Sequence, residues 1–92
     1  MKIRWSKEAE SDVEAIFEFI SRDKLEAAIR TERRIYEAAP ILEMFPELGR
    51  SGRLSGTREF RVSGLPYVIV YRVVDDVIDL RNVVHFAQSW PR

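Results

Sequence analysis

The sequence predicts an α+β fold, in which an N-terminal strand and a helix hairpin pack on one face of an antiparallel sheet in the order β-α-α-β-β-β. Three observations lead to this prediction. Apolar residues recur at helical spacing through the first half of the chain, they alternate or run together through the second half, and a glycine-rich segment separates the halves. We expect residues 1–92 to form a single domain, because a chain of this length builds only one modest core.

The first half of the chain is predicted to begin with a strand and a helix. Ile3 and Trp5 alternate with basic residues, which is the period of a half-buried strand. Ser6 then offers a hydroxyl as a helix cap, and apolar residues follow at helical spacing. We therefore expect a first helix from about Lys7 to Ser21, with an acidic side that faces solvent.

A second helix should follow after a short connection and complete an antiparallel hairpin. Asp23 can cap this helix, and its apolar positions run from Leu25 to Leu42. Pro40 lies inside the pattern. Because proline lacks a backbone donor and clashes with the carbonyl four residues earlier, we expect a kink or a restart at this position.

The second half of the chain is predicted to form three consecutive antiparallel strands after a basic loop. Residues 49–56 hold three glycines and two arginines, and too few apolar residues for a helix or a strand. The expected strands span 57–62, 67–73 and 77–85.

The faces of the last two strands can be assigned from alternation along each strand. In the middle strand, the side chains expected to face the helices are Tyr67, Ile69, Tyr71 and Val73. In the last strand, strict alternation places Ile78, Leu80, Asn82 and Val84 on one side, and Val77, Asp79, Arg81, Val83 and His85 on the other.

Composition excludes several classes of function. The chain has no cysteine and one histidine, so we expect no disulfide, no metal site and no cofactor. Its glycines fit neither a P-loop nor a dinucleotide-binding spacing. It holds neither a signal-peptide pattern nor an apolar run near the roughly 20 residues that span a bilayer, so we expect a cytoplasmic protein that does not contact membranes.

Charge is segregated along the chain, although the formal net charge is zero. Residues 6–48 hold eleven acidic and six basic side chains, whereas residues 49–92 hold four acidic and seven basic ones. The zero total argues against a general nucleic-acid binder, and the basic excess belongs to the predicted loop and sheet.

The candidate binding residues are the cations of the loop and the sheet. An arginine fork suits a carboxylate or a phosphate, and several arginines together form an anion-binding surface. A single strand arginine is explained more simply by solvation or by an ion pair, for which Glu59 and Asp79 are available. The candidates are Arg50, Arg53, Arg58, Arg61, Arg72 and Arg81.

Two further candidates lie near the C-terminus. Imidazoles serve as general acids or bases near neutral pH, so His85 is a candidate, and the simpler alternative is a strand-end histidine bonded to the backbone. Trp90 can stack on a partner, or it can anchor the chain end against Phe86 and Pro91, which is the simpler interpretation.

Three segments of the chain resemble a known protein family. They read FPELGR at 45–50, GTREF at 56–60 and PYVIVYRV at 66–73. With the predicted order of elements, they resemble the RelE/ParE toxin superfamily of bacterial type II toxin-antitoxin systems. The similarity covers nearly the whole chain, from Trp5 to Pro91, and is greatest to the ParE branch.

The superfamily includes two mechanisms. RelE-like members are ribosome-dependent mRNA interferases, and the resemblance assigns their catalytic set to Arg61, Arg81 and His85. The match is incomplete at two positions. Glu59 replaces a residue that is usually basic in these enzymes, and Val68 replaces a residue that is usually arginine. Cleavage of a phosphodiester depends on cationic contacts that stabilise the developing charge, so these departures argue against an enzyme.

The resemblance therefore implies a ParE-like toxin that inhibits DNA gyrase by binding, without an assigned catalytic residue. The alternative is an mRNA interferase, an endoribonuclease with the ribosome and mRNA as partners. In either case the resemblance implies a cognate antitoxin whose tail lies across the helix hairpin and the sheet, and contact with DNA only through the antitoxin complex. A relative that keeps the fold and has lost toxicity is a third reading.

Overall fold

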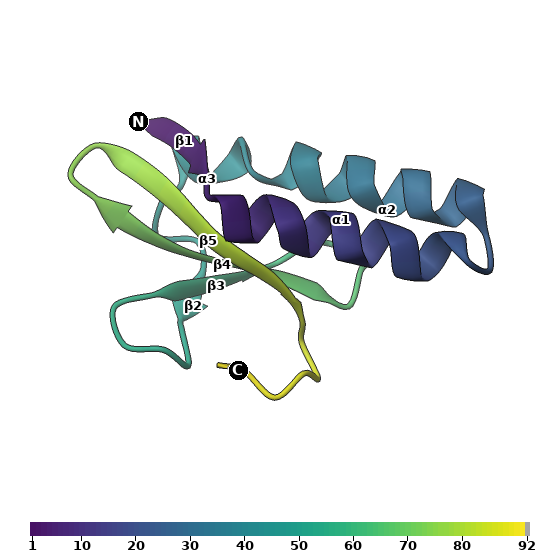
Figure 1. The fold of residues 1–92 in the computed structure, drawn as a ribbon. Helices are drawn as coiled ribbons and strands as arrows, with labels where there is room; N and C mark the ends of the chain where they lie inside the picture. The colour runs from purple at the N-terminus through teal and green to yellow at the C-terminus, as the bar shows by residue number, and fades with distance from the viewer. Residues whose placement is uncertain (92) are drawn as a thin grey trace.

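A computed structural model describes residues 1–91 and contains both predicted helices and all the predicted strands (Figure 1). The elements in chain order are β1 (Lys2–Trp5), α1 (Lys7–Ser21), α2 (Leu25–Ala38), α3 (Ile41–Met44), β2 (Arg50–Ser51), β3 (Arg58–Arg61), β4 (Tyr67–Val74) and β5 (Val77–His85).

The strands form one mixed sheet in the order β1-β5-β4-β3-β2. The pairs β5–β4 and β4–β3 are antiparallel, as expected, and β3–β2 is antiparallel as well. The sequence left the place of the first strand open, and β1 pairs with β5 in parallel, with Ile3 opposite Ile78. The prediction of an unbroken loop over 49–56 is wrong at Arg50–Ser51, because this segment adds to the sheet edge through backbone pairing, which needs no apolar side chain.

The helix hairpin begins as predicted. The Ser6 hydroxyl accepts a hydrogen bond from the Ala9 backbone N–H at 3.0 Å, which caps α1. The predicted cap at Asp23 is wrong, because the Asp23 N–H donates to Ile20 in the turn that ends α1, and Lys24 is the N-cap of α2. The restart expected at Pro40 is confirmed, since α2 ends at Ala38 and Pro40 is the N-cap of α3.

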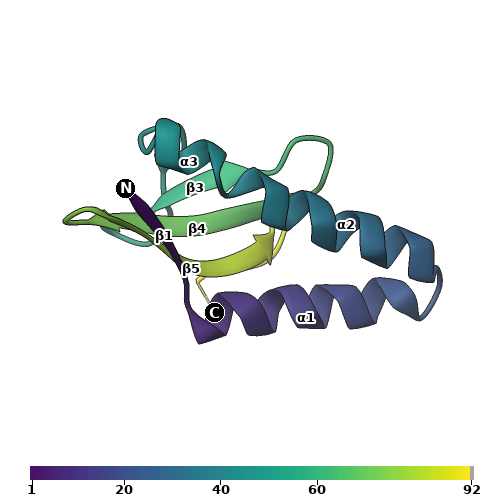
Figure 2. The same cartoon turned by 90° about the horizontal axis from the view of Figure 1, so that it is seen from above.

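The core lies between the hairpin and the sheet, and α1 runs along β5 (Figure 2). Its buried apolar residues come from α1, α2, the segment after α2 and the inner face of the sheet. They are Val13, Ile35, Ala38, Ala39, Leu42, Val62, Tyr67, Ile69, Tyr71, Ile78, Leu80 and Val83. The helix-facing assignment of β4 is therefore confirmed for Tyr67, Ile69 and Tyr71.

The assignment is wrong for Val73, which is 40% exposed. This residue lies near the β4–β5 turn, where the hairpin of strands projects past the helices (Figure 2). A second error lies in β5, where strict alternation fails. The pairing shifts between Val70 and Tyr71 of β4, whose partners are Asn82 and Leu80. The residue left over at this irregularity is Arg81, as in a β-bulge, so alternation changes phase there.

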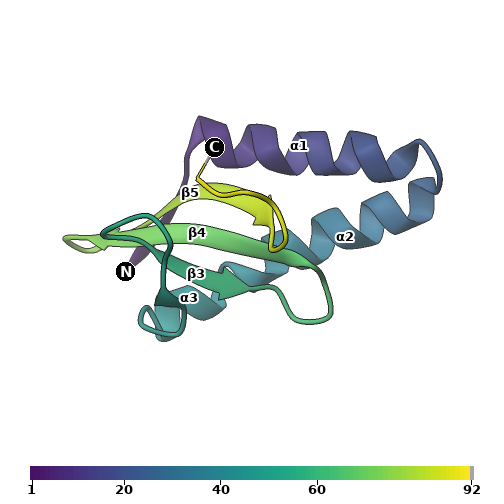
Figure 3. The same ribbon diagram turned by 90° about the horizontal axis from the view of Figure 1, so that it is seen from below.

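The change of phase moves the side chains after Arg81 across the sheet, and His85 accordingly lies on the helix side. Val83 joins Leu80 in the core beneath the helices, although the two were predicted on opposite sides. Val84 instead packs with Val68 and Val70 on the face of the sheet that carries no helix. We call this face the open face; Figure 3 views the molecule from that side.

The C-terminal segment returns onto the open face. Trp90 packs against the cluster formed by Val68, Val70 and Val84. The turn after β5 is held by the Phe86 N–H, which donates to the Pro66 carbonyl at 2.8 Å. The last described residues thus cover part of the sheet opposite the helices.

Candidate functional site

The open face carries a cluster of three arginines around one buried carboxylate. Asp79 lies in β5 and is 1% exposed. Its Oδ1 lies 3.3 Å from Arg4 of β1, and its Oδ2 lies 3.4 Å from both Arg72 of β4 and Arg81 of β5. Strand pairing explains the arrangement, because Arg4 and Arg72 are the partners of Asp79 on its two neighbouring strands. We call these four residues the Asp79 cluster.

A second ion pair lies at the other side of the open face. Glu59 of β3 is 3% exposed and accepts hydrogen bonds from Arg53, through the backbone N–H at 2.9 Å and through Nε at 3.1 Å. Burial by itself would raise the pKa of Glu59, but the hydrogen bonds from Arg53 and the charges of Arg53 and Arg50 outweigh burial and lower it. Glu59 is therefore held as a carboxylate.

A hollow of about 290 Å³ adjoins this pair and is lined by Arg50, Glu59, Arg61, Val68 and Phe86. The Arg61 guanidinium lies 4.3 Å above the centre of the Phe86 ring, a cation–π contact, and its Nε donates to the Leu65 carbonyl at 3.3 Å. Val68 adds an apolar side chain to the lining of the hollow.

Arg58 does not belong to the open face. It pairs with Tyr71 on the helix side of the sheet, and its Nη1 donates to the Gly49 carbonyl at 2.7 Å. This contact fastens the segment before β2 to β3. The basic loop predicted from the sequence is therefore divided, with Arg50 and Arg53 on the open face and Arg58 on the other.

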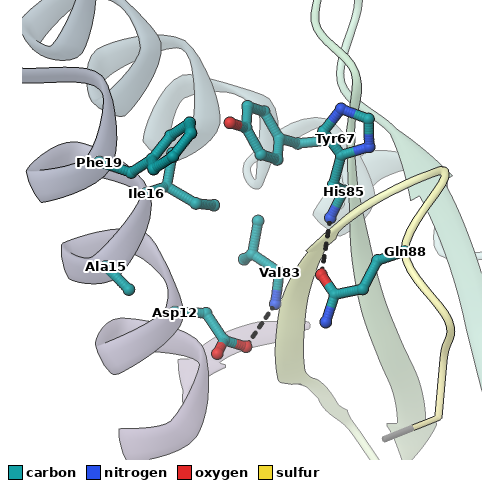
Figure 4. A pocket seen from close by; sticks show the side chains of 8 residues that line it. All are labelled: Asp12, Ala15, Ile16, Phe19, Tyr67, Val83, His85 and Gln88. Carbon is teal, nitrogen blue, oxygen red and sulfur yellow. Dashed lines mark hydrogen bonds between the residues drawn. The ribbon is translucent and has the colours of Figure 1, made fainter. Parts of the chain in front are cut away.

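His85 lies at the end of β5 beside a groove on the helix side (Figure 4). Its Nδ1 accepts a hydrogen bond from the Ala87 N–H at 3.1 Å, and its ring stacks on Phe86 and meets Tyr67 edge-on. These contacts agree with the simpler interpretation of a strand-end histidine bonded to the backbone.

The groove has a cavity volume of about 260 Å³ and lies between α1 and the ends of β4 and β5. Its α1 wall is mostly apolar, and Phe19 in that wall is 68% exposed. Figure 4 shows the α1 side chains facing Tyr67 and Val83 across the groove. Asp12 closes one end, where its Oδ2 accepts hydrogen bonds from the Val83 N–H and the Asn82 side chain, both at 3.0 Å. The lining residues are Asp12, Ala15, Ile16, Phe19, Tyr67, Val83, His85 and Gln88.

The three residues predicted as the alternative catalytic set make different contacts. Arg81 is bound to Asp79, Arg61 lies over Phe86, and His85 faces the helix-side groove. Arg81 and His85 are four residues apart on one strand, which corresponds to about 13 Å. Arg81 is therefore distant from His85 along the strand, whereas Arg61 and His85 both contact the Phe86 ring. Residues 1–91 also contain no cluster of acidic or histidine side chains able to hold a metal ion.

Sequence reasoning missed two features of these sites. Arg4 was assigned only to the exposed side of the first strand, and the parallel pairing of β1 with β5 is what places it beside Asp79. Phe19 was assigned to no site, although an exposed aromatic residue near the end of a helix was a visible signal. The suggestion that strand arginines pair with acidic residues is confirmed for Asp79, whereas Glu59 pairs with Arg53, which lies between β2 and β3.

Comparison with solved structures identifies the fold first. The fold matches a chain from the chromosomal ParDE toxin-antitoxin system of P. aeruginosa, with a TM-score of 0.83, 22% sequence identity, and coverage of 92% of this chain and 95% of that chain. This likeness defines the fold as one found in a toxin-antitoxin system.

Sequence comparison then gives the family. The family model described as the ParE toxin of the type II toxin-antitoxin system, parDE, matches residues 3–90. The protein Y4kP of Sinorhizobium fredii is 37% identical over 91 residues, which cover 99% of this chain and 94% of that protein. Toxin RelE2 of Caulobacter vibrioides is 32% identical over 87 residues, covering 95% and 97%. The chain belongs to the ParE toxin family of type II toxin-antitoxin systems.

Family membership gives the general function of the protein. The chain is the toxin component of a type II toxin-antitoxin system, and such a system includes an antitoxin partner. Within residues 1–91, no helix is long and apolar enough to cross a membrane.

Proposed function

We propose that this toxin arrests growth by binding DNA gyrase in the cytoplasm, and that it is not a nuclease. One observation carries the proposal. Arg81 is engaged by Asp79 and Arg61 by Phe86, and the side chain beside Arg61 in the hollow is the apolar Val68. Because Arg81 does not converge with His85 on one site, we favour action through the surface that the toxin presents to a partner.

A supercoiling assay tests the proposal. Purified toxin is added to gyrase, ATP and relaxed plasmid, and the products are separated with and without protein denaturation. We expect supercoiling to fall with toxin concentration, together with linear DNA that appears on denaturation. Full supercoiling at toxin concentrations well above that of gyrase would contradict the proposal.

The mRNA interferase remains the alternative function, and the basic residues Arg61 and Arg81 are the observation in its favour. If this alternative holds, translating ribosomes supplied with the toxin will yield cut transcripts. The variants Arg61→Ala and His85→Ala will then lose this cleavage by factors of about a hundred or more, as expected for groups that act on the reacting phosphate.

We further propose that the cognate antitoxin lies across the helix hairpin and the sheet, and that it inserts an apolar side chain into the groove beside Phe19. Two features support this placement. The groove is apolar with a polar end at Asp12, and Phe19 is 68% exposed at its mouth. An amphipathic antitoxin segment gains affinity by burying apolar anchors in such a groove.

Substitution in the groove tests the antitoxin site. Phe19→Glu is expected to weaken binding of the antitoxin encoded beside the toxin gene by at least about tenfold, since it places a charge against an apolar anchor. Val74→Glu is the matched control, because Val74 is 41% exposed at the end of β4 beside the β4–β5 turn, away from the groove. Equal affinities of the two variants in calorimetric titration would exclude the groove.

A further inference from the structure

The Asp79 cluster holds more positive charge than its carboxylate can neutralise. One carboxylate faces three guanidinium groups, which leaves an excess of two positive charges at this point. Each guanidinium has five N–H donors, and only one or two of them are directed at Asp79. The side chains of Arg4, Arg72 and Arg81 are 64%, 49% and 40% exposed, so the remaining donors are accessible to a ligand.

Asp79 also fixes where these donors lie. A carboxylate that is 1% exposed is rigidly placed by the strand that carries it, and the three guanidinium groups share its two oxygens. The arginine side chains are therefore partly ordered before a ligand binds, so binding costs less conformational entropy. A group of this kind is a preorganised binding site for an anion.

The open face carries further positive charge besides the Asp79 cluster. Strand pairing places Lys2, Arg50 and Arg61 on the same face, from β1 at one edge to β2 at the other, and the ion pair with Glu59 holds Arg53 there. The acidic residues of these strands are Asp79 and Glu59, and both are buried against arginines. Asp75 and Asp76 lie beyond the cluster, in the turn between β4 and β5.

The exposed apolar residues lie mainly on the other side of the molecule. They belong to the helix hairpin, to α3 and to the segment that follows it, and include Phe19, Leu25, Ile29, Met44, Phe45 and Leu48. On the open face, Phe86 lies beneath the Arg61 guanidinium. A protein partner that docks by burying apolar surface would find its anchors on the helix side, whereas the open face offers mainly charge.

We propose that the open face, centred on Arg4, Arg72 and Arg81, binds the phosphate backbone of double-stranded DNA directly. Five strands at about 4.8 Å spacing give a sheet about 19 Å wide. That width covers several phosphates, since one occurs about every 3.4 Å along each DNA strand. The net charge of the sequence does not indicate this surface, because acidic residues in the helical half of the chain cancel the basic residues of the sheet in the total. The proposal does not depend on gyrase.

The test is fluorescence anisotropy of a labelled mixed-sequence DNA duplex titrated with the free toxin at several salt concentrations. Binding is expected at low salt. If the three arginines of the cluster each contact a phosphate, a plot of log K against log salt concentration has a slope of about −2.7. An unchanged anisotropy at low salt, or a slope near zero, would overturn the proposal.

Charge-matched variants locate the surface. The double variant Arg4→Gln/Arg72→Gln is expected to bind at least about tenfold more weakly, with a slope smaller by about 1.8. The control is Arg30→Gln/Arg33→Gln, which removes the same charge from exposed positions of α2 and is expected to bind as the unaltered protein does. Equal weakening by both double variants would overturn the proposal.

Two further measurements keep the test decisive. If the double variant fails to fold, as judged by circular dichroism, Arg4→Gln alone replaces it, since Arg4 is the most exposed member of the cluster. The expected decrease in slope is then about half as large. A labelled glutamate-rich peptide is titrated in parallel. If the peptide binds through Arg4 and Arg72 and the duplex does not, the surface receives an acidic peptide and the DNA proposal is wrong.

Discussion

At the scale of single residues, hydrogen bonds of the Tyr71 hydroxyl join the sheet to the segment that follows α3. Tyr71 is fully buried, donates to the Pro46 carbonyl at 2.7 Å and accepts from the Gly49 N–H at 2.9 Å. Burial raises its pKa, against the opposing effects of the Gly49 hydrogen bond and the Arg58 charge, so the hydroxyl keeps its proton. Gly49 permits this approach, because a Cβ there would lie 2.7 Å from Tyr71 Cε1.

We predict that Tyr71→Phe lowers the free energy of unfolding by about 1–3 kcal/mol, because it leaves two buried backbone groups without their partner. Urea denaturation measures the change. Tyr36→Phe is the control, since the Tyr36 side chain is 40% exposed, and we expect it to stay within about 0.5 kcal/mol of the unaltered protein. A Tyr71→Phe variant as stable as Tyr36→Phe would show that water replaces the lost hydroxyl.

The Glu59–Arg53 pair makes part of the stability dependent on pH. The pKa of Glu59 in the folded protein is lowered from its ordinary value of 4.5. A group with a lowered folded pKa contributes stability above its unfolded pKa and loses the contribution as the pH falls through the folded pKa. We predict that the free energy of unfolding decreases between about pH 5 and about pH 3, and that Glu59→Gln makes this decrease smaller. Identical pH profiles for the two proteins would contradict the ion pair.

The sequence could predict which residue types meet on the open face, but it could not predict the geometry. Glu59 and Asp79 were visible as possible partners for strand arginines, because alternation places unlike charges on one face. That Asp79 collects three arginines depends on β1 pairing with β5, a contact between residues about 75 positions apart that no local pattern encodes.

At the scale of elements, β4 is the central support of the fold. Its apolar run over 67–71 is buried on both faces, with Ile69 beneath the helices and Val70 beneath the C-terminal segment. The run was readable from the sequence because it is rich in β-branched and aromatic residues. The sequence did not predict the residue at which burial of β4 ends, because that residue depends on how far the helices extend over the strand.

We predict opposite outcomes for one substitution at two positions of β4. Ile69→Asp buries an unpaired charge at a fully buried site and is expected to unfold the protein, at a cost of more than about 4 kcal/mol. Val73→Asp is expected to remain folded, because Val73 is 40% exposed near the strand turn. Circular dichroism with a urea titration measures both. A folded Ile69→Asp protein would show that the register of β4 is wrong by one residue.

The irregularity in β5 shows why faces cannot be read from alternation alone. One extra residue at Arg81 reverses the sides of everything that follows, which brings Val83 into the core and Val84 onto the open face. The sequence over 77–85 contains no glycine or proline to mark the position. The structure also shows what stabilises the shifted segment, since Asp12 of α1 accepts hydrogen bonds from Asn82 and Val83.

At the scale of the whole molecule, segregation of charge along the chain becomes segregation between two faces. The acidic excess over 6–48 lies in the helical half, and the basic excess lies in the β-sheet (Figure 1). The two faces therefore suit different partners: an apolar groove for the antitoxin on the helix side, and an anion-binding surface on the other. The sequence could predict the charge balance of each half, but only the packing of helices on one face separates the charges in space.

The measurement that tests the central claim most directly is a map of mRNA 5′ ends shortly after the toxin is induced in bacterial cells, with growth followed in the same culture. The claim is that the toxin acts by binding and does not cut RNA. The account predicts arrested growth with intact transcripts. New 5′ ends within translated codons, lost in the Arg61→Ala variant, would contradict it and would establish an interferase with an unexpected catalytic set.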